Sequence, residues 1–150
     1  MSESPKAPEG PRKPPESSRK PKEPRRGLAI GEYLAHILEG VERIEPYTRG
    51  CSREAFLGSD LIQDGVIRNL EVIGEASGNL LKLYPEFARL HPEIQLSSAY
   101  QMRKALIHGY TTVDVNLGWQ TVFTSIPALK RQLKALEQGR NATRDAQDLG

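Results

Sequence analysis

Three side chains that could act together on a phosphate ester lie close together in the second half of the chain. Arg103, His108 and Tyr110 fit the pattern R-x-x-x-x-H-x-Y. An imidazole, whose ordinary pKa is about 6.5, accepts and returns a proton near neutral pH. The planar guanidinium of an arginine binds two phosphate oxygens at once. Side chains of these two types are the ones that proton transfer at a phosphate ester requires.

The helix that must carry these residues is predicted to begin at Ser97 or Ser98 and to end near Gly109. With about 100° per residue, Arg103 would lie about 140° away from His108 on an ideal helix. One ideal helix therefore cannot direct both side chains to the same point. Either the helix unwinds near its end, or a second copy of the helix completes the site, and we favour the second copy.

The surrounding segments carry a resemblance to a known family. The motif follows a long helical segment, IRNLEVIGEA (residues 67–76), and precedes VDVNLGWQTVFTSIPAL (residues 113–129). Together they resemble HepT-like domains of the HEPN superfamily over most of residues 28–136. That resemblance implies a helical homodimer with a composite active site. It also implies an endoribonuclease toxin that cuts RNA without a metal or cofactor and is paired with a minimal nucleotidyltransferase (MNT) antitoxin.

The same resemblance implies roles for individual residues. Arg103 and His108 would be catalytic, and Tyr110 would be the tyrosine that the antitoxin adenylylates. The chain departs from the family at Lys104, where an asparagine is typical, and it lacks a tryptophan that many relatives carry near residues 92–96. Lys104 would lower the pKa of His108 through its charge, or bind an RNA phosphate, and we leave both roles open.

RNA suits this pair of residues because it contains its own nucleophile, the 2′-hydroxyl group. A base must take the proton of that group, and a fixed cation must balance the charge that builds on phosphorus. We therefore expect a 2′,3′-cyclic phosphate and a 5′-hydroxyl as products. DNA has no 2′-hydroxyl and should not be cleaved.

Structural roles for the same residues remain as alternatives. His108 could interact only with the carbonyl end of its helix. Arg103 could form an ion pair with Glu71 or Glu75, which would also orient it for catalysis. Tyr110 could simply anchor the turn. The functional alternative is a catalytically silent HEPN binding module that dimerises and engages a nucleotidyltransferase or a nucleotide.

Apolar residues recur every three or four positions in several segments, which is typical of amphipathic helices. We predict an all-α fold, an antiparallel, HEPN-like bundle of four to five helices. Gly74 and Gly78 lie one turn apart in the second long helix, where each costs about 1 kcal/mol relative to alanine. A neighbouring backbone should therefore approach them closely. The predicted elements are a helix over 28–46, a short helix over 52–57, a long helix over 60–82, an irregular connection over 84–96, the motif helix, a β-prone stretch at 111–113 and a helix over 114–138 that Pro127 kinks or divides.

Composition divides the chain into three parts. Residues 1–27 form a tail that is expected to be disordered, because residues 1–26 contain seven of the 11 prolines and a net charge of +4. The helical domain is predicted over 28–137 and a flexible C-terminal tail over 138–150. Since the chain has no long apolar run, a single cysteine (Cys51) and no Cys/His cluster at zinc spacing, we expect a cytoplasmic protein with no membrane contact and no metal site.

Overall fold

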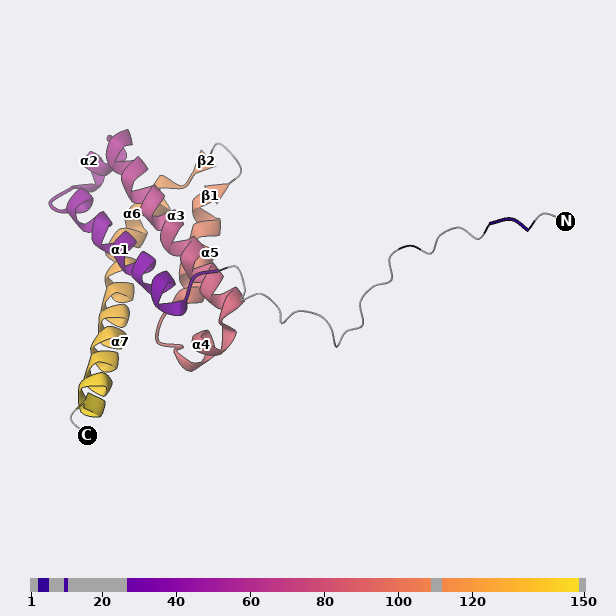
Figure 1. Cartoon of the computed structure of the whole chain (residues 1–150). Helices are drawn as coiled ribbons and strands as arrows, with labels where there is room; N and C mark the ends of the chain where they lie inside the picture. Colours follow the sequence, from indigo (N-terminus) through magenta and orange to yellow (C-terminus); the bar gives the residue numbers. More distant parts are fainter. Residues whose placement is uncertain (1–2, 6–9, 11–26, 109–111, 149–150) are drawn as a thin grey trace.

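A computed structural model describes residues 3–5, 10, 27–108 and 112–148 of the 150-residue chain. Helices dominate this part, as the sequence predicted, and one short strand pair interrupts them (Figure 1). None of the helices described is long and apolar enough to cross a bilayer. The elements in chain order are α1 (Ile30–Thr48), α2 (Arg53–Leu57), α3 (Asp60–Leu83), α4 (Pro85–Leu90), α5 (Leu96–Leu106), β1 (Ile107–His108), β2 (Thr112–Val113), α6 (Val115–Phe123) and α7 (Ser125–Asp148).

Serine side chains cap the N-terminal ends of two of the helices. Ser52 Oγ accepts a hydrogen bond from the backbone N–H of Ala55 over 3.0 Å at the start of α2. Ser59 Oγ accepts one from Ile62 over 3.2 Å at the start of α3. Each cap satisfies a backbone donor that the first helical turn leaves free. The predicted starts of both helices are thus confirmed.

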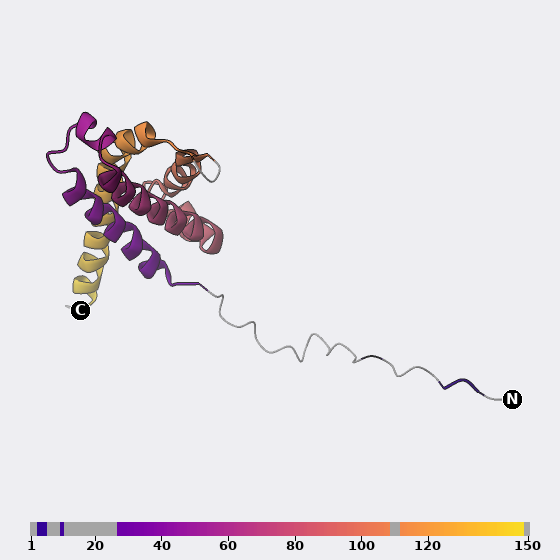
Figure 2. The same cartoon turned by 90° about the horizontal axis from the view of Figure 1, so that it is seen from above.

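The bundle is built around α3, which packs against α1 on one side and α5 on another (Figures 1 and 2). Glycines allow these close approaches. A Cβ atom added to Gly40 of α1 would lie only 2.8 Å from Ile73 Cγ1, and Gly74 and Gly78 contact α5 in the same way. The predicted close approach of a neighbouring backbone is confirmed at Gly74, which meets the carbonyl oxygen of Ala99, whereas Gly78 meets the ring of Tyr100. The fully buried core side chains include Ile37, Val41, Ile44, Phe56, Val66, Leu70, Ile73, Leu80, Leu96 and Leu106.

The predicted C-terminal helix is divided in two, as Pro127 suggested. The division falls at Thr124, and Pro127 occupies the third position of α7. A proline is tolerated in the first turn because its missing N–H would have no partner there. The break therefore lies just before the proline rather than at it.

Helix α7 continues beyond the predicted end near Gln138. It extends to Asp148, and Thr143 Oγ1 donates a hydrogen bond to the carbonyl of Gly139 over 3.0 Å. The predicted helix end near Gln138 was therefore wrong, since residues 138–148 contain good helix formers and no proline. The last turns of α7 reach past the other helices at one end of the molecule (Figure 1).

Two other predicted boundaries need correction. Helix α1 does not end at Pro46 but continues to Thr48, whose hydroxyl donates to the carbonyl of Ile44 over 3.1 Å. The connection over residues 84–96 is not irregular throughout, because it contains α4. Pro85 is the first residue of α4, where its fixed φ favours a helix start.

Candidate active site

The helix that carries Arg103 ends earlier than the sequence predicted. It ends at Leu106 rather than near Gly109, and the next two residues, including His108, form β1. Strand β1 pairs antiparallel with β2, and the backbone N–H of Asp114 donates to the carbonyl of Leu106 over 2.7 Å. Three of the four paired residues are β-branched, which favours extended backbone. The β-prone stretch at 111–113 is thus confirmed at its last two residues, and its pairing explains the early helix end.

This hairpin changes the relation between the motif residues. Arg103 lies in the last turn of α5, whereas His108 lies in β1, so the angle of an ideal helix does not apply to the pair. The local unwinding that the sequence left as one alternative does occur. Tyr110 lies outside the described residues. The hairpin lies at the opposite end of the molecule from the C terminus of α7 in both views (Figures 1 and 2).

The side chain of Arg103, which belongs to α5, packs against α3. A Cβ atom added to Gly74 would lie 2.4 Å from Arg103 Cβ and 3.0 Å from Arg103 Cδ, so the stem of the side chain lies directly on the α3 backbone. The Arg103 Nε atom is buried and has no hydrogen-bond partner among the described residues. Leaving such a donor unpaired costs about 1–3 kcal/mol. A buried donor without a partner is uncommon in native structures, and such groups often belong to functional sites.

The two carboxylates expected near Arg103 do not pair with it in the described part of the chain. Glu71 Oε2 lies 3.9 Å from Nη1 of Arg68, one turn earlier on α3. Glu75 is exposed and has no ion pair within the described ranges. The structure therefore does not contain the Arg103 ion pair that the sequence allowed, and the guanidinium is not neutralised by either glutamate.

Lys104 is exposed and its ammonium lies over an aromatic ring. Lys104 Nζ is 4.2 Å from the centroid of the Tyr100 ring, which is a cation–π contact. The ring in turn lies against α3, because a Cβ atom on Gly78 would be 2.6 Å from Tyr100 Cδ2. Lys104 is thus held on the surface of α5, next to the turn that carries Arg103.

A hollow of about 340 Å³ adjoins the motif hairpin between β2 and α3. Its walls are partly apolar and partly charged, and Glu71 and Arg68 belong to its α3 side. This places Glu71 next to the hairpin even though it does not contact Arg103. The lining residues are Gln63, Asp64, Ile67, Arg68, Glu71, Val113 and Val115.

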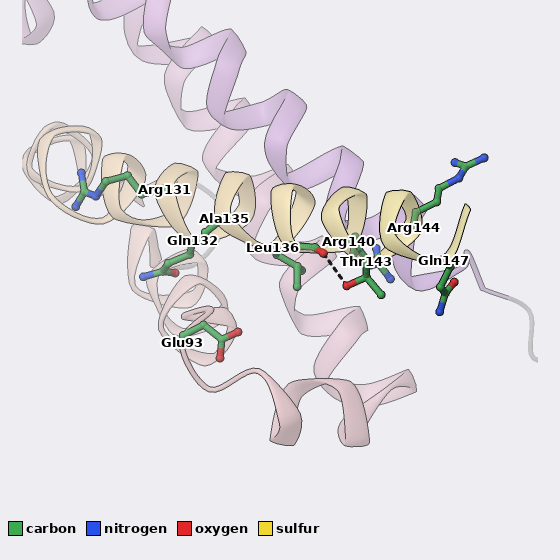
Figure 3. A pocket seen from close by; sticks show the side chains of 10 residues that line it. Glu93, Arg131, Gln132, Ala135, Leu136, Arg140, Thr143, Arg144 and Gln147 are labelled. Carbon is green, nitrogen blue, oxygen red and sulfur yellow. Dashed lines mark hydrogen bonds between the residues drawn. The ribbon is translucent and has the colours of Figure 1, made fainter. Parts of the chain in front are cut away.

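A larger hollow, of about 770 Å³, lies along α7 (Figure 3). It is formed between Glu93 and one side of α7, and it contains no motif residue. A hydrogen bond from His91 Nδ1 to Glu93, over 2.8 Å, lowers the pKa of the Glu93 carboxyl. Within the described ranges, no group of three or more His, Cys, Asp or Glu side chains could hold a metal ion.

Comparison with known proteins identifies the family. The family model described as ribonuclease HepT-like matches residues 37–136, from α1 through the motif and into α7. The chain belongs to the HepT-like ribonuclease family. This confirms the resemblance inferred from the motif and its flanking helices. No solved structure is significantly similar to the chain.

Several curated relatives match most of their own length. A protein of Thermococcus cleftensis named "Probable ribonuclease HepT" is 45% identical over 71% of this chain and 94% of its own. Two proteins named "Putative RNase" are also similar. The one from Caldanaerobacter subterraneus subsp. tengcongensis is 36% identical over 71% of this chain and 92% of its own. The one from Methanocaldococcus jannaschii is 33% identical over 71% of this chain and 86% of its own.

Two residues near the motif were not singled out from the sequence. Tyr100 supports Lys104. The sequence could have indicated this contact, because side chains four positions apart are neighbours on a helix. Arg68 engages Glu71, and their spacing of three on a predicted helix was also visible. By contrast, no local pattern could reveal that Arg103 Nε has no partner in the part of the chain that the structure describes, because this depends on how α5 packs on α3.

Proposed function

We propose that the chain is a metal-independent endoribonuclease in which Arg103 binds the scissile phosphate and His108 transfers protons. Membership of the HepT-like ribonuclease family supports RNA cleavage as the reaction. The observation that carries the role of Arg103 is its buried Nε atom without a partner among the described residues. A phosphate oxygen would accept that hydrogen bond, and its negative charge would match the unneutralised guanidinium.

The proposed reaction is an internal transfer within RNA. The 2′-oxygen attacks phosphorus, and its proton goes to a neutral His108. The bond from phosphorus to the 5′-oxygen breaks, and that oxygen receives a proton from a protonated imidazole. The products are a 2′,3′-cyclic phosphate and a 5′-hydroxyl, and the positive charge of Arg103 stabilises the charge on the phosphoryl oxygens in the transition state.

A homodimer would supply the second imidazole. One copy of the chain has one motif histidine, whereas the reaction uses a base and an acid at the same time. A composite site explains how both are present. Mixing inactive Arg103→Ala and His108→Ala proteins should not restore cleavage even if subunits exchange, because a mixed dimer would keep only one of the two imidazoles.

The family also supports a regulatory arrangement, and we propose that the enzyme is a toxin whose antitoxin is a minimal nucleotidyltransferase. The antitoxin would transfer AMP from ATP to the phenolic oxygen of Tyr110 and release pyrophosphate. Intact mass after incubation with ATP and that enzyme should increase by whole adenylyl groups. The increase should be absent in Tyr110→Phe, and the modified protein should no longer cleave RNA.

RNA cleavage in the presence of EDTA tests the proposed activity. RNA and DNA of one sequence are incubated with wild-type protein, with His108→Ala and with His36→Ala, a matched control at an exposed position on α1. Wild type and His36→Ala should cut the RNA but not the DNA. His108→Ala should cut neither nucleic acid. If wild-type protein with unmodified Tyr110 leaves RNA intact, the catalytically silent binding module replaces the ribonuclease.

A further inference from the structure

Three aromatic rings form a row from the core to the surface on the side of α2 and α6. Phe56 of α2 is fully buried, and its ring centroid lies 5.3 Å from that of Trp119. The Trp119 ring is followed by Phe123, with centroids 4.4 Å apart and planes inclined by 59°. Phe123 is 51% exposed at the end of α6. The row therefore presents an exposed aromatic ring that packs on a partly buried one, Trp119, and through it on the buried Phe56.

Open space surrounds this exposed ring. Phe123 and Trp119 line a hollow of about 590 Å³, whose other walls include Arg53 and Asn116. Phe123 also lines a second hollow of about 470 Å³, formed between the end of α1, near Arg49, and the start of α7. A flat group can therefore reach the Phe123 ring without displacing a neighbouring element.

The hollows around Phe123 are also positively charged. Arg53 Nη2 donates a hydrogen bond to Asn116 Oδ1 over 2.9 Å, which fixes the guanidinium next to α6. Arg49, Arg53 and Arg131 line the two hollows and have no ion pair in the part of the chain that the structure describes. Residues 27–150 carry a net charge of −2, so this local group of unpaired arginines is not a general property of the domain.

We propose that this surface, formed by Trp119 and Phe123 together with Arg49 and Arg53, binds single-stranded RNA apart from the cleavage site. A nucleobase would stack on Phe123, and the arginines would bind the flanking phosphates. The choice of RNA rests on the proposed function. Helix α6 spans roughly 12 Å between β2 and Phe123, so one strand can reach both sites. Stacking does not depend on base identity, and the surface would therefore hold substrates without selecting a sequence.

Trp119 is the only tryptophan of the chain, so its fluorescence reports directly on this surface. The full chain is titrated with single-stranded DNA, which has bases and phosphates but no 2′-hydroxyl and so remains uncut. Binding should quench Trp119, and the anisotropy of a labelled strand should give the same affinity. Phe123→Ala should weaken binding by about five-fold or more, and Phe123→Tyr should bind like wild type.

Exposed residues elsewhere provide matched controls. Leu90→Ala removes an apolar side chain that is 64% exposed on α4 and should leave the affinity unchanged. Arg53→Gln should reduce the dependence of log affinity on log salt by about one. Arg43→Gln, in which the arginine is paired with Glu39 on α1, should not reduce it. Equal affinity of Phe123→Ala and wild type, or binding without quenching of Trp119, would overturn the proposal.

The exposed ring could instead be a contact between two copies of the chain. In that case Phe123→Ala would shift the sedimentation coefficient towards a smaller species and leave the affinity for the strand unchanged. A smaller species together with an unchanged affinity would also overturn the proposal that this surface binds RNA. Binding that depends on Phe123, with an unchanged oligomeric state, supports it.

The proposed surface and the proposed reaction can fail separately. If RNA is not cleaved but Phe123→Ala still weakens strand binding, the surface stands and the ribonuclease does not. Suppose instead that wild type cleaves RNA and that Phe123→Ala cleaves both a long RNA and a dinucleotide at the wild-type rate. The proposed reaction is then correct and the proposed RNA-binding surface is not. If both are correct, Phe123→Ala should slow cleavage of long RNA and leave dinucleotide cleavage unchanged.

Discussion

Gly74→Ala should destabilise the protein and displace Arg103. The added methyl group would lie 2.4 Å from Arg103 Cβ and 3.1 Å from the carbonyl oxygen of Ala99, so the backbones of α3 and α5 must move apart. Overpacking of this kind costs typically about 1–3 kcal/mol, and contact with backbone places it at the upper end. Alanine recovers about 1 kcal/mol of helix propensity. The net loss in the free energy of unfolding should be about 2 kcal/mol, or about 8 °C in Tm.

Urea denaturation and thermal melting measure this loss, and the cleavage rate measures the displacement of Arg103. Gly31→Ala in α1 is the matched control, because nothing lies within 4 Å of the added Cβ atom. That variant should be as stable as wild type or up to about 1 kcal/mol more stable. A Gly74→Ala protein with the stability and cleavage rate of wild type would refute the close packing of α5 on α3.

Three further predictions address the cap and the cations near the motif. Ser59→Ala removes the cap of α3 and should lower the free energy of unfolding by about 1 kcal/mol in urea, with no change in the cleavage rate per folded molecule. Arg103→Lys keeps the charge but not the planar fork, and single-turnover cleavage should fall by about 100-fold while the melting temperature changes little. Lys104→Gln should raise KM for RNA and reduce the salt slope of binding by about one, with kcat unchanged, if the exposed ammonium binds a phosphate.

Local sequence signals predicted much of the bundle. The starts of the helices over 52–57 and 60–82 were predicted, and the Ser52 and Ser59 side chains that cap them act over only three positions of sequence. Gly74 and Gly78 pointed to a close neighbour, because two glycines within a helix are costly unless packing compensates. The family could be inferred from the motif together with its flanking helices.

Features that depend on pairing between distant segments were harder to predict. Helix α5 was expected to reach Gly109, but Ile107 and His108 pair with Val113 and Thr112 of β2, and no helical periodicity reports such a partner. The end of α7 was missed for another reason. Its last turns are exposed and polar, so they have no apolar periodicity to distinguish them from a loop.

The candidate site was predicted as a set of residue types but not as an arrangement. The sequence offered Glu71 and Glu75 as partners of Arg103, yet Glu71 lies near Arg68 instead. The Nε of Arg103, which has no partner within residues 27–108 and 112–148, and the aromatic row ending at Phe123 both arise where different helices meet. Such features follow from tertiary packing, which a pattern within one helix does not contain.

A single 2′-deoxynucleotide placed at the mapped cleavage position of an RNA substrate tests most directly whether the 2′-hydroxyl is the nucleophile that His108 activates. We predict that cleavage at that linkage stops, that other linkages are cut as before, and that the unsubstituted RNA gives a 2′,3′-cyclic phosphate and a 5′-hydroxyl. Cleavage of the deoxy linkage at the rate of the unsubstituted one would show that another nucleophile attacks, and would contradict the assigned roles of His108 and Arg103.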